Sequence, residues 1–330
     1  MAETITSTSV RTESQTPQTS GAGSARPRRP RLTAAGLLPF FAYVFVFFLV
    51  PIGFILYNAF EQTITSASTK RDPVTQQFIH ASQTNYTADN VTTTLHGIYA
   101  TSLVNSVELS AVVAVIGAVI GLLLAYAVVN SRSGLLKQVV SAASAVTANF
   151  GGIPLAFLFI ATIGAKAGVI TQFLQDHLDL SLANDLHFQL TSVTGVGLVY
   201  MYFLVPLMVL VMTPALEGLK PQWAEAAENL GANRWQYWRH VAGPVLAPNF
   251  LGAILLLFCS SFSAYATADA LVGQSLPLVP TQIANVLSGN VLSGQENIGA
   301  ALALDMIVIV LPLTVVYLLL ERRTTRWLQS

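Results

Sequence analysis

The sequence predicts an all-α integral membrane protein with six transmembrane helices and a cytoplasmic helix between the fourth and the fifth. Three observations support this prediction. Charged residues make up 10% of the 330 residues, whereas soluble domains contain about 25%. Six apolar stretches are about 20 residues long, the length at which a helix crosses the hydrocarbon core. The basic residues concentrate in alternate connecting segments, as the positive-inside rule describes for multi-pass proteins.

The first 32 residues are rich in Ser, Thr, Pro and Arg and hold almost no large apolar side chains. Such a segment buries too little apolar surface to offset the entropy of ordering it. We therefore expect 1–32 to be a disordered cytoplasmic tail and 33–330 to form the six-span domain. A signal peptide is the alternative, but the following apolar run is longer than an h-region and lacks a small-x-small cleavage site.

The apolar stretches set the limits of the predicted spans, at about 34–59, 103–129, 139–163, 193–213, 247–267 and 298–320. In the second span, Gly117 and Gly121 form a seam of small residues that predicts close contact with another helix. The third span is interrupted by Gly151, Gly152 and Pro154. We expect it to be kinked, which membranes tolerate where protein or water satisfies the freed backbone groups.

The distribution of charge predicts the orientation. Thirteen of the 16 Lys and Arg residues fall in the tail, after the second and fourth spans, or after the sixth. This bias places both termini in the cytoplasm. The outer segments hold three bases against eight acids, a net charge of −5. The outer face is therefore acidic.

Several functional classes are excluded or disfavoured by composition. The 16 acids balance the 16 bases, so the basic excess typical of a nucleic-acid-binding protein is missing. Gly218-Leu219-Lys220 is followed by Pro221 and does not form the phosphate-cradling G-x-x-x-x-G-K-[ST] loop. We expect neither an enzyme nor a protein with a cofactor of its own.

The segment 214–246 is too polar to span a membrane, yet it is strongly patterned. Pro221 is suited to the first position of a helix, and Gly231 to the position just after its end. We expect a short helix, a sharp turn and a second helix. An amphipathic interfacial helix that merely joins two spans is the alternative interpretation of this loop.

The same loop resembles a known motif. Glu225-Ala226-Ala227 is followed after three residues by Gly231 and, after nine more, by Val241-Ala242-Gly243-Pro244. The spacing is that of the EAA motif, in which the last part reads I-x-L-P, so Gly243 departs from the pattern. On these residues the chain resembles the membrane permease subunits of binding-protein-dependent ABC importers.

The resemblance implies that the protein lies in the inner (cytoplasmic) membrane, and it implies how the protein works. Glu225 to Gly231 would form a coupling helix that docks on a separate ATP-hydrolysing subunit, and ATP would be bound by that partner. The residues carried over from the motif are Glu225, Ala226, Ala227, Gly231 and Pro244. The implied partners are a dimer of ABC ATPase subunits, a second permease subunit that makes a heterodimeric pore, and an extracytoplasmic substrate-binding protein.

Polar residues within the spans are candidates for the translocation path, because ionisable groups there are costly. Glu108, Asp269 and Asp305 cluster by depth in the outer third, where they would attract a cation. Near the interface, however, a carboxylate also reaches water. Ser260, Ser263 and Thr267 fall on one helical face and would line a polar route. Alternatively, such hydroxyls bond to their own helix.

The expected cargo rests on a looser resemblance, which extends from about Asn105 to the C-terminus. Ser261 to Ala268, with Leu198 to Glu217, look like the branch that serves polyamines and the related permeases for phosphonates, ferric iron and thiamine. The acidic outer face favours spermidine or putrescine. An ion-coupled secondary transporter is the rival class, since broken helices and intramembrane carboxylates occur there too.

Overall fold

The computed structural model describes residues 38–71, 78–165, 168–179, 182, 185, 188–289 and 297–329. The tail predicted for residues 1–32 lies outside the described residues. The chain divides into two compact units, residues 1–51 and 52–330. Helix α2 (Leu38–Val44) and the π-helix η1 (Phe45–Leu49) belong to the first unit, and α3 (Val50–Ala59) continues the run into the second.

The loop after α3 contains a β-hairpin that the sequence analysis did not predict. Strands β1 (Glu61–Arg71) and β2 (Phe78–Tyr86) pair antiparallel. The base of the hairpin is fixed by two amides, because Nδ2 of Asn90 and Nδ2 of Asn297 each donate to the Glu61 carbonyl oxygen at 2.8 Å. Asn90 belongs to the short helix α4 (Asp89–Thr94).

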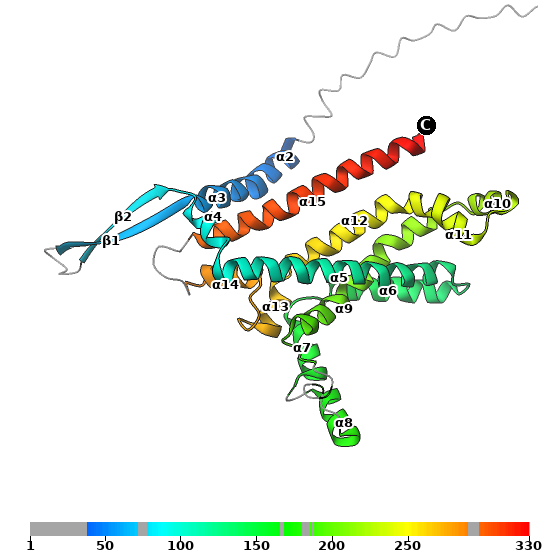
Figure 1. Cartoon of the computed structure of the whole chain (residues 1–330), viewed down its shortest axis with the longest axis horizontal. Coiled ribbons are helices and arrows are strands. Elements are labelled where there is room, and N and C mark those ends of the chain that lie inside the picture. The colour runs from blue at the N-terminus through cyan, green and yellow to red at the C-terminus, as the bar shows by residue number, and fades with distance from the viewer. Residues whose placement is uncertain are drawn as a thin grey trace, which may run out of the picture. The chain divides into compact units, whose positions relative to one another are not determined.

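The centre of the second unit is a packed group of long helices (Figure 1). Its members are α5 (Gly97–Asn130), α6 (Gly134–Asn149), α9 (Val193–Glu217) and α12 (Gly243–Phe262). Helices α5 and α9 approach closely at the predicted small-residue seam, since a Cβ built at Gly121 would lie 2.5 Å from the Cβ of Met208. Many apolar side chains on the outer faces of these helices are exposed, as lipid contact requires.

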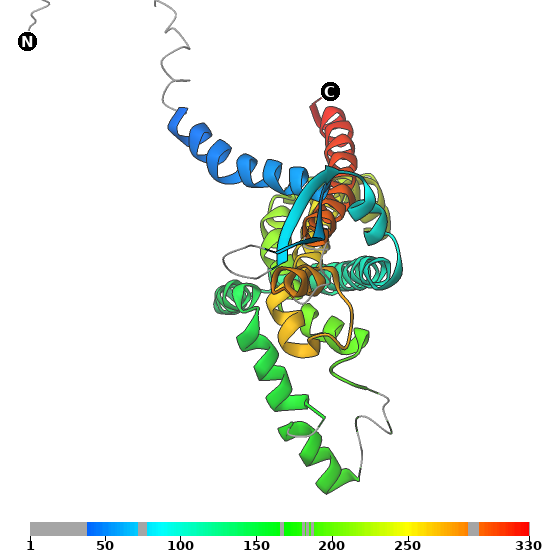
Figure 2. The same ribbon diagram turned by 90° about the vertical axis from the view of Figure 1, so that its left-hand side faces the viewer.

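The predicted third span is broken sharply. Helix α6 ends at Asn149, and α7 (Ile153–Ile163) leaves at an angle of 102°. Gly152 lies at the corner with φ +80°, a conformation that glycine adopts without strain. Helix α7 and the following α8 (Val169–Leu178) run away from the packed helices (Figure 2). The expected kink is therefore confirmed.

The fifth predicted span is interrupted near its end, whereas the sixth is one continuous helix. The fifth lies within a helical run from Arg234 to Phe262 and ends five residues earlier than predicted. It is followed by the short helices α13 (Tyr265–Val272) and α14 (Val279–Leu287). The sixth is the long helix α15 (Ile298–Gln329). Among the described residues, five helices are long and apolar enough to span a membrane, or six if the bent pair is one span. The all-α membrane fold is confirmed.

Candidate functional site

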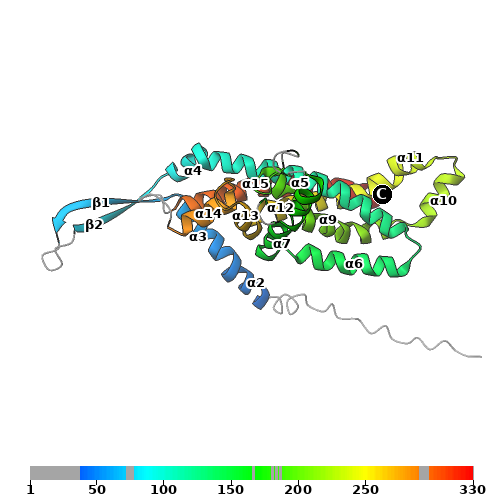
Figure 3. The ribbon, with the colours of Figure 1, turned by 90° about the horizontal axis from the view of Figure 1, so that it is seen from below.

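The predicted coupling loop lies at one end of the helix bundle, and the β-hairpin lies at the other (Figure 3). The loop contains α10 (Pro221–Asn229), α11 (Arg234–Tyr237) and the π-helix η2 (Trp238–Ala242). None of the residues of α10 is buried. The helix therefore projects from the bundle with its side chains available to a partner.

The turn after α10 follows from the glycine in its sequence. Gly231 has φ +78°. The Ala232 N–H donates to the Ala227 carbonyl oxygen at 3.0 Å, and the Gly231 N–H donates to that of Glu228 at 2.9 Å. These two bonds form a Schellman motif, which satisfies carbonyl groups at the helix end. The predicted helix and sharp turn are present.

The second helix begins with a reciprocal cap and contains a π turn. The Gln236 N–H donates to the side chain of Asn233, and the Asn233 N–H donates to that of Gln236, both at 2.8 Å. The π-helix η2 follows and ends at Ala242, with Gly243 as its C-cap. A Cβ at residue 243 would lie 2.6 Å from the Trp238 carbonyl oxygen. The glycine that departs from the EAA pattern therefore permits the π turn.

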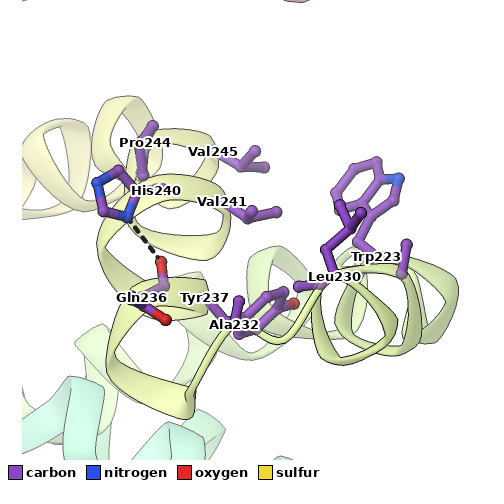
Figure 4. A pocket seen from close by; sticks show the side chains of 11 residues that line it. Trp223, Leu230, Ala232, Gln236, Tyr237, His240, Val241, Pro244 and Val245 are labelled. Atoms are coloured by element: carbon purple, nitrogen blue, oxygen red, sulfur yellow. Dashed lines mark hydrogen bonds between the residues drawn. The ribbon is translucent and has the colours of Figure 1, made fainter.

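An apolar groove of about 600 Å³ lies between α10 and the start of α12 (Figure 4). Trp223 and Ala226 of α10 line it together with Leu230, the residue that follows this helix. Val241, Pro244 and Val245 line the other wall. Nδ1 of His240 is hydrogen bonded to the Gln236 carbonyl oxygen at 3.0 Å.

Most of the residues carried over from the motif meet at this groove. Ala226, Ala227 and Pro244 line it, and Gly231 forms the adjoining turn. Glu225 is exposed on α10 and is absent from the groove lining among the described residues. The loop thus presents both a helix and a concave apolar surface to a partner.

The structure separates the three hydroxyl residues that were predicted to share a helical face. Ser260 lies in α12, whereas Ser263 follows its end and Thr267 lies in α13. The Ser263 hydroxyl donates to the Cys259 carbonyl oxygen at 2.8 Å, as the alternative interpretation expects. Thr267 is buried, and its Oγ1 accepts a hydrogen bond from the Gly152 N–H at 2.8 Å. The break after Phe262 therefore removes the continuous polar face.

The three carboxylates also occupy different environments. Glu108 on α5 and Asp269 on α13 are exposed, and Asp269 is hydrogen bonded to the Tyr265 hydroxyl. Asp305 on α15 is buried and hydrogen bonded to Thr94 of α4, while its Oδ2 has no partner among the described residues. Only Asp305 carries the desolvation cost that marks an intramembrane carboxylate.

Sequence reasoning missed the contacts that hold the segment between the fifth and sixth spans. The buried Tyr200 hydroxyl donates to the Ala264 carbonyl oxygen at 2.9 Å. On α5, Nδ2 of Asn105 donates to the Pro277 carbonyl oxygen at 3.2 Å, and Ser106 Oγ accepts from the Val279 N–H at 2.9 Å. A lone polar residue in an apolar span was the available signal, but it does not identify the partner.

The sequence matches a family of transport proteins and is similar to individual permeases. The sequence profile described as "binding-protein-dependent transport system inner membrane component" matches residues 117–326, more than half of the chain. A putative ferric transport system permease protein from Haemophilus influenzae is 24% identical over 190 residues, which cover 57% of this chain and 29% of that protein.

Two further comparisons involve different cargoes. A spermidine/putrescine transport system permease protein from Haemophilus influenzae is 32% identical over 123 residues, which cover 37% of this chain and 41% of that protein. The chain thus matches less than half the length of either relative. A bacterial alginate ABC transporter, solved with its alginate pentasaccharide-bound periplasmic protein, has the same fold, with a TM-score of 0.67 at 17% identity over 90% of this chain and 96% of that one.

Proposed function

We propose, because this chain belongs to the family of binding-protein-dependent transport system inner membrane components, that it is the permease subunit of an ABC importer. The coupling loop is the observation that supports this proposal most strongly. Helix α10 has no buried residue, and its end is fixed by a Schellman turn at Gly231. A helix whose end is fixed by hydrogen bonds, and which is not buried by any residue that the structure describes, is suited to enter another subunit.

In this proposal the energy for transport comes from a partner. The coupling helix contacts an ATPase subunit that binds and hydrolyses ATP, and this chain binds no nucleotide itself. Closure of two ATPase subunits displaces α10, and the displacement reaches the fifth span through α11 and η2. Rigid spans then alternate in their access to the two sides of the membrane.

Reconstitution tests this division of labour. Vesicles that contain the full complex, with ATP and the binding protein supplied, are expected to accumulate cargo against its gradient. Vesicles that contain this chain alone are expected to accumulate none. Uphill transport by the chain alone, without nucleotide, would contradict the proposal and favour the ion-coupled secondary transporter.

The remaining parts of the importer are proposed from topology. With both termini in the cytoplasm, the coupling loop faces the ATPase, and the opposite end of the bundle receives the extracytoplasmic binding protein. A second permease subunit completes a heterodimeric pore. Asp305, with Glu108 and Asp269, contributes polar groups to the outer third of the path.

We propose a polyamine as the cargo. The outer segments carry a net charge of −5, which attracts a polycation, and a spermidine/putrescine permease is among the relatives. Uptake of labelled spermidine is expected to exceed that of 2-aminoethylphosphonate when the complex is tested with its own binding protein. Transport of the phosphonate alone would overturn this assignment and leave the permease function intact.

A further inference from the structure

A small cavity lies inside the bundle, where the end of α12 meets α5 and α9. Its volume is about 10 Å³, and one water molecule needs a space of about 10–15 Å³. Four of the residues that line it carry a hydroxyl group, namely Ser106 and Ser110 of α5, Tyr200 of α9 and Ser261 of α12. Each of these four residues is at most 3% exposed. The cavity is therefore too small for a cargo molecule, yet its wall contains four buried hydroxyl groups.

Two of these hydroxyl groups already use their proton. The Tyr200 hydroxyl donates to the Ala264 carbonyl oxygen at 2.9 Å, and the Ser261 hydroxyl donates to the Phe258 carbonyl oxygen at 3.1 Å. A hydroxyl group has one proton and two lone pairs. The oxygen atoms of Tyr200 and Ser261 can therefore still accept a hydrogen bond, but neither group can donate another.

The two serines of α5 have the opposite capacity. The Ser106 oxygen accepts a hydrogen bond from the Val279 N–H at 2.9 Å, and its own proton goes to no residue that the structure describes. Ser110 forms no hydrogen bond within the described part of the chain, although it is 1% exposed. A buried hydroxyl group without a partner is costly. Both serines thus have a proton that needs an acceptor.

Two available donors and two available acceptors around one cavity match the capacity of a water molecule, which accepts two hydrogen bonds and donates two. A metal cation would bind lone pairs only, so the protons of Ser106 and Ser110 would stay unpaired. An ammonium group has the same defect, because it donates hydrogen bonds and accepts none. The volume and the hydrogen-bonding capacity of the wall therefore select the same ligand.

We propose that this cavity binds one structural water molecule, which accepts hydrogen bonds from Ser106 and Ser110 and donates to Tyr200 and Ser261. Buried waters typically make about three hydrogen bonds to polar groups that are otherwise unsatisfied. Because its partners belong to α5, α9 and α12, the water joins these three helices directly before the break after Phe262. This inference goes beyond the proposed function, and it does not depend on the cargo.

A high-resolution structure of the complete importer tests the proposal directly. In a map that resolves other buried waters, we expect one peak in the cavity at about 2.5–3.0 Å from the hydroxyl oxygens of Ser106 and Ser110. The absence of a peak from such a map would overturn the proposal. The measurement uses the unaltered protein, so it decides the question even where a variant fails to fold.

A substitution at Ser110 separates a hydrated cavity from a dry one by the sign of its effect. With water bound, Ser110→Ala removes one of the hydrogen bonds that hold the water, and the thermal midpoint in detergent is expected to fall. In a dry cavity the same substitution removes a buried hydroxyl group that has no partner. The midpoint would then rise or stay unchanged, and either result would contradict the proposal.

Ser102→Ala is the matched control on the same helix. Ser102 is also buried, but its hydroxyl donates to the Tyr99 carbonyl oxygen of its own helix at 2.8 Å, and the residue is not part of the cavity lining that the structure describes. Its substitution is expected to lower the thermal midpoint by less than Ser110→Ala does. Equal falls would reflect the general cost of truncating a buried serine and would count against a bound water.

Discussion

The two ends of the helix bundle are built in opposite ways. At the coupling end, α10 buries none of its residues, and bonds between near neighbours in the chain shape the turn after it and the start of α11. At the opposite end, which carries the hairpin, Tyr200 of α9 holds the break after Phe262 through the Ala264 carbonyl oxygen, and Asn105 of α5 holds Pro277 before α14. The difference indicates that the coupling end is shaped by its own local sequence, whereas the hairpin end is held to the bundle by contacts between distant helices.

The largest effect that tests this contrast is expected at Gly231. In Gly231→Val the turn after α10 is strained, because a left-handed backbone costs a non-glycine residue about 1–2 kcal/mol and a β-branched residue more. Uptake is expected to fall at least about tenfold while membrane insertion is unchanged. Open space surrounds the position, with no atom within 4 Å of an added Cβ, so the backbone is the cause.

Gly231→Asn is the matched control, because asparagine tolerates the left-handed conformation. It is expected to retain most of the uptake. Full uptake by Gly231→Val would contradict the coupling role of the turn. A loss of insertion would show that this end of the molecule contributes to the bundle after all.

The next largest effect is a loss of stability, expected at the end of the bundle that carries the hairpin. Tyr200→Phe removes the hydroxyl that donates to the Ala264 carbonyl oxygen at 2.9 Å. Because Tyr200 is 1% exposed, water does not readily replace the hydroxyl, and the free energy of unfolding is expected to fall by about 1–3 kcal/mol. Thermal unfolding in detergent measures the change.

Tyr202→Phe is the control on the same helix, since Tyr202 is 37% exposed and packs edge to face on Phe159. A change of less than about 0.5 kcal/mol is expected there. Equal losses of unfolding free energy in the two variants would show that the hydrogen bond from Tyr200 to Ala264 does not stabilise the protein specifically.

A smaller effect is expected at Thr267, which links two broken spans. Thr267→Val removes the acceptor for the Gly152 N–H and is expected to lower stability by about 1 kcal/mol. Thr162→Val is the comparison, because the Thr162 hydroxyl bonds to the Leu158 carbonyl oxygen of its own helix at 2.6 Å. A lower thermal midpoint for Thr267→Val than for Thr162→Val would support a stabilising role of the bond between Gly152 and Thr267. Identical unfolding curves would argue against it.

The same contrast explains which features were predictable from the sequence. Pro221 and Gly231 act on their own neighbours, so they predict the helix and turn directly. Gly151, Gly152 and Pro154 predicted a break in the third span, but the 102° bend also depends on the distant Thr267. The end of the fifth span at Phe262 was not predictable, because a phenol on another helix fixes Ala264.

The hairpin was missed for a different reason. A search for apolar stretches of about 20 residues passes over Glu61 to Arg71, although Thr63, Ile64 and Thr65 are β-branched residues of the kind that favour strands. Asn90 and Asn297, which fix its base, are 207 positions apart in the sequence. No local pattern in the sequence relates one of these amides to the other.

The smallest effect is expected at Asn233 and tests whether the coupling end is locally built. Asn233→Ala removes the cap of α11, whose two hydrogen bonds measure 2.8 Å, at a local cost of about 0.5–1 kcal/mol. Hydrogen exchange at the Gln236 amide is expected to accelerate about two- to fivefold. Asn229→Ala, at the end of α10, alters no cap of α11 and is the control. Because α11 has no buried residue, the thermal midpoint of the bundle is expected to stay unchanged. A lower midpoint would mean that the loop and the bundle unfold together, and the distinction between the two ends would fail.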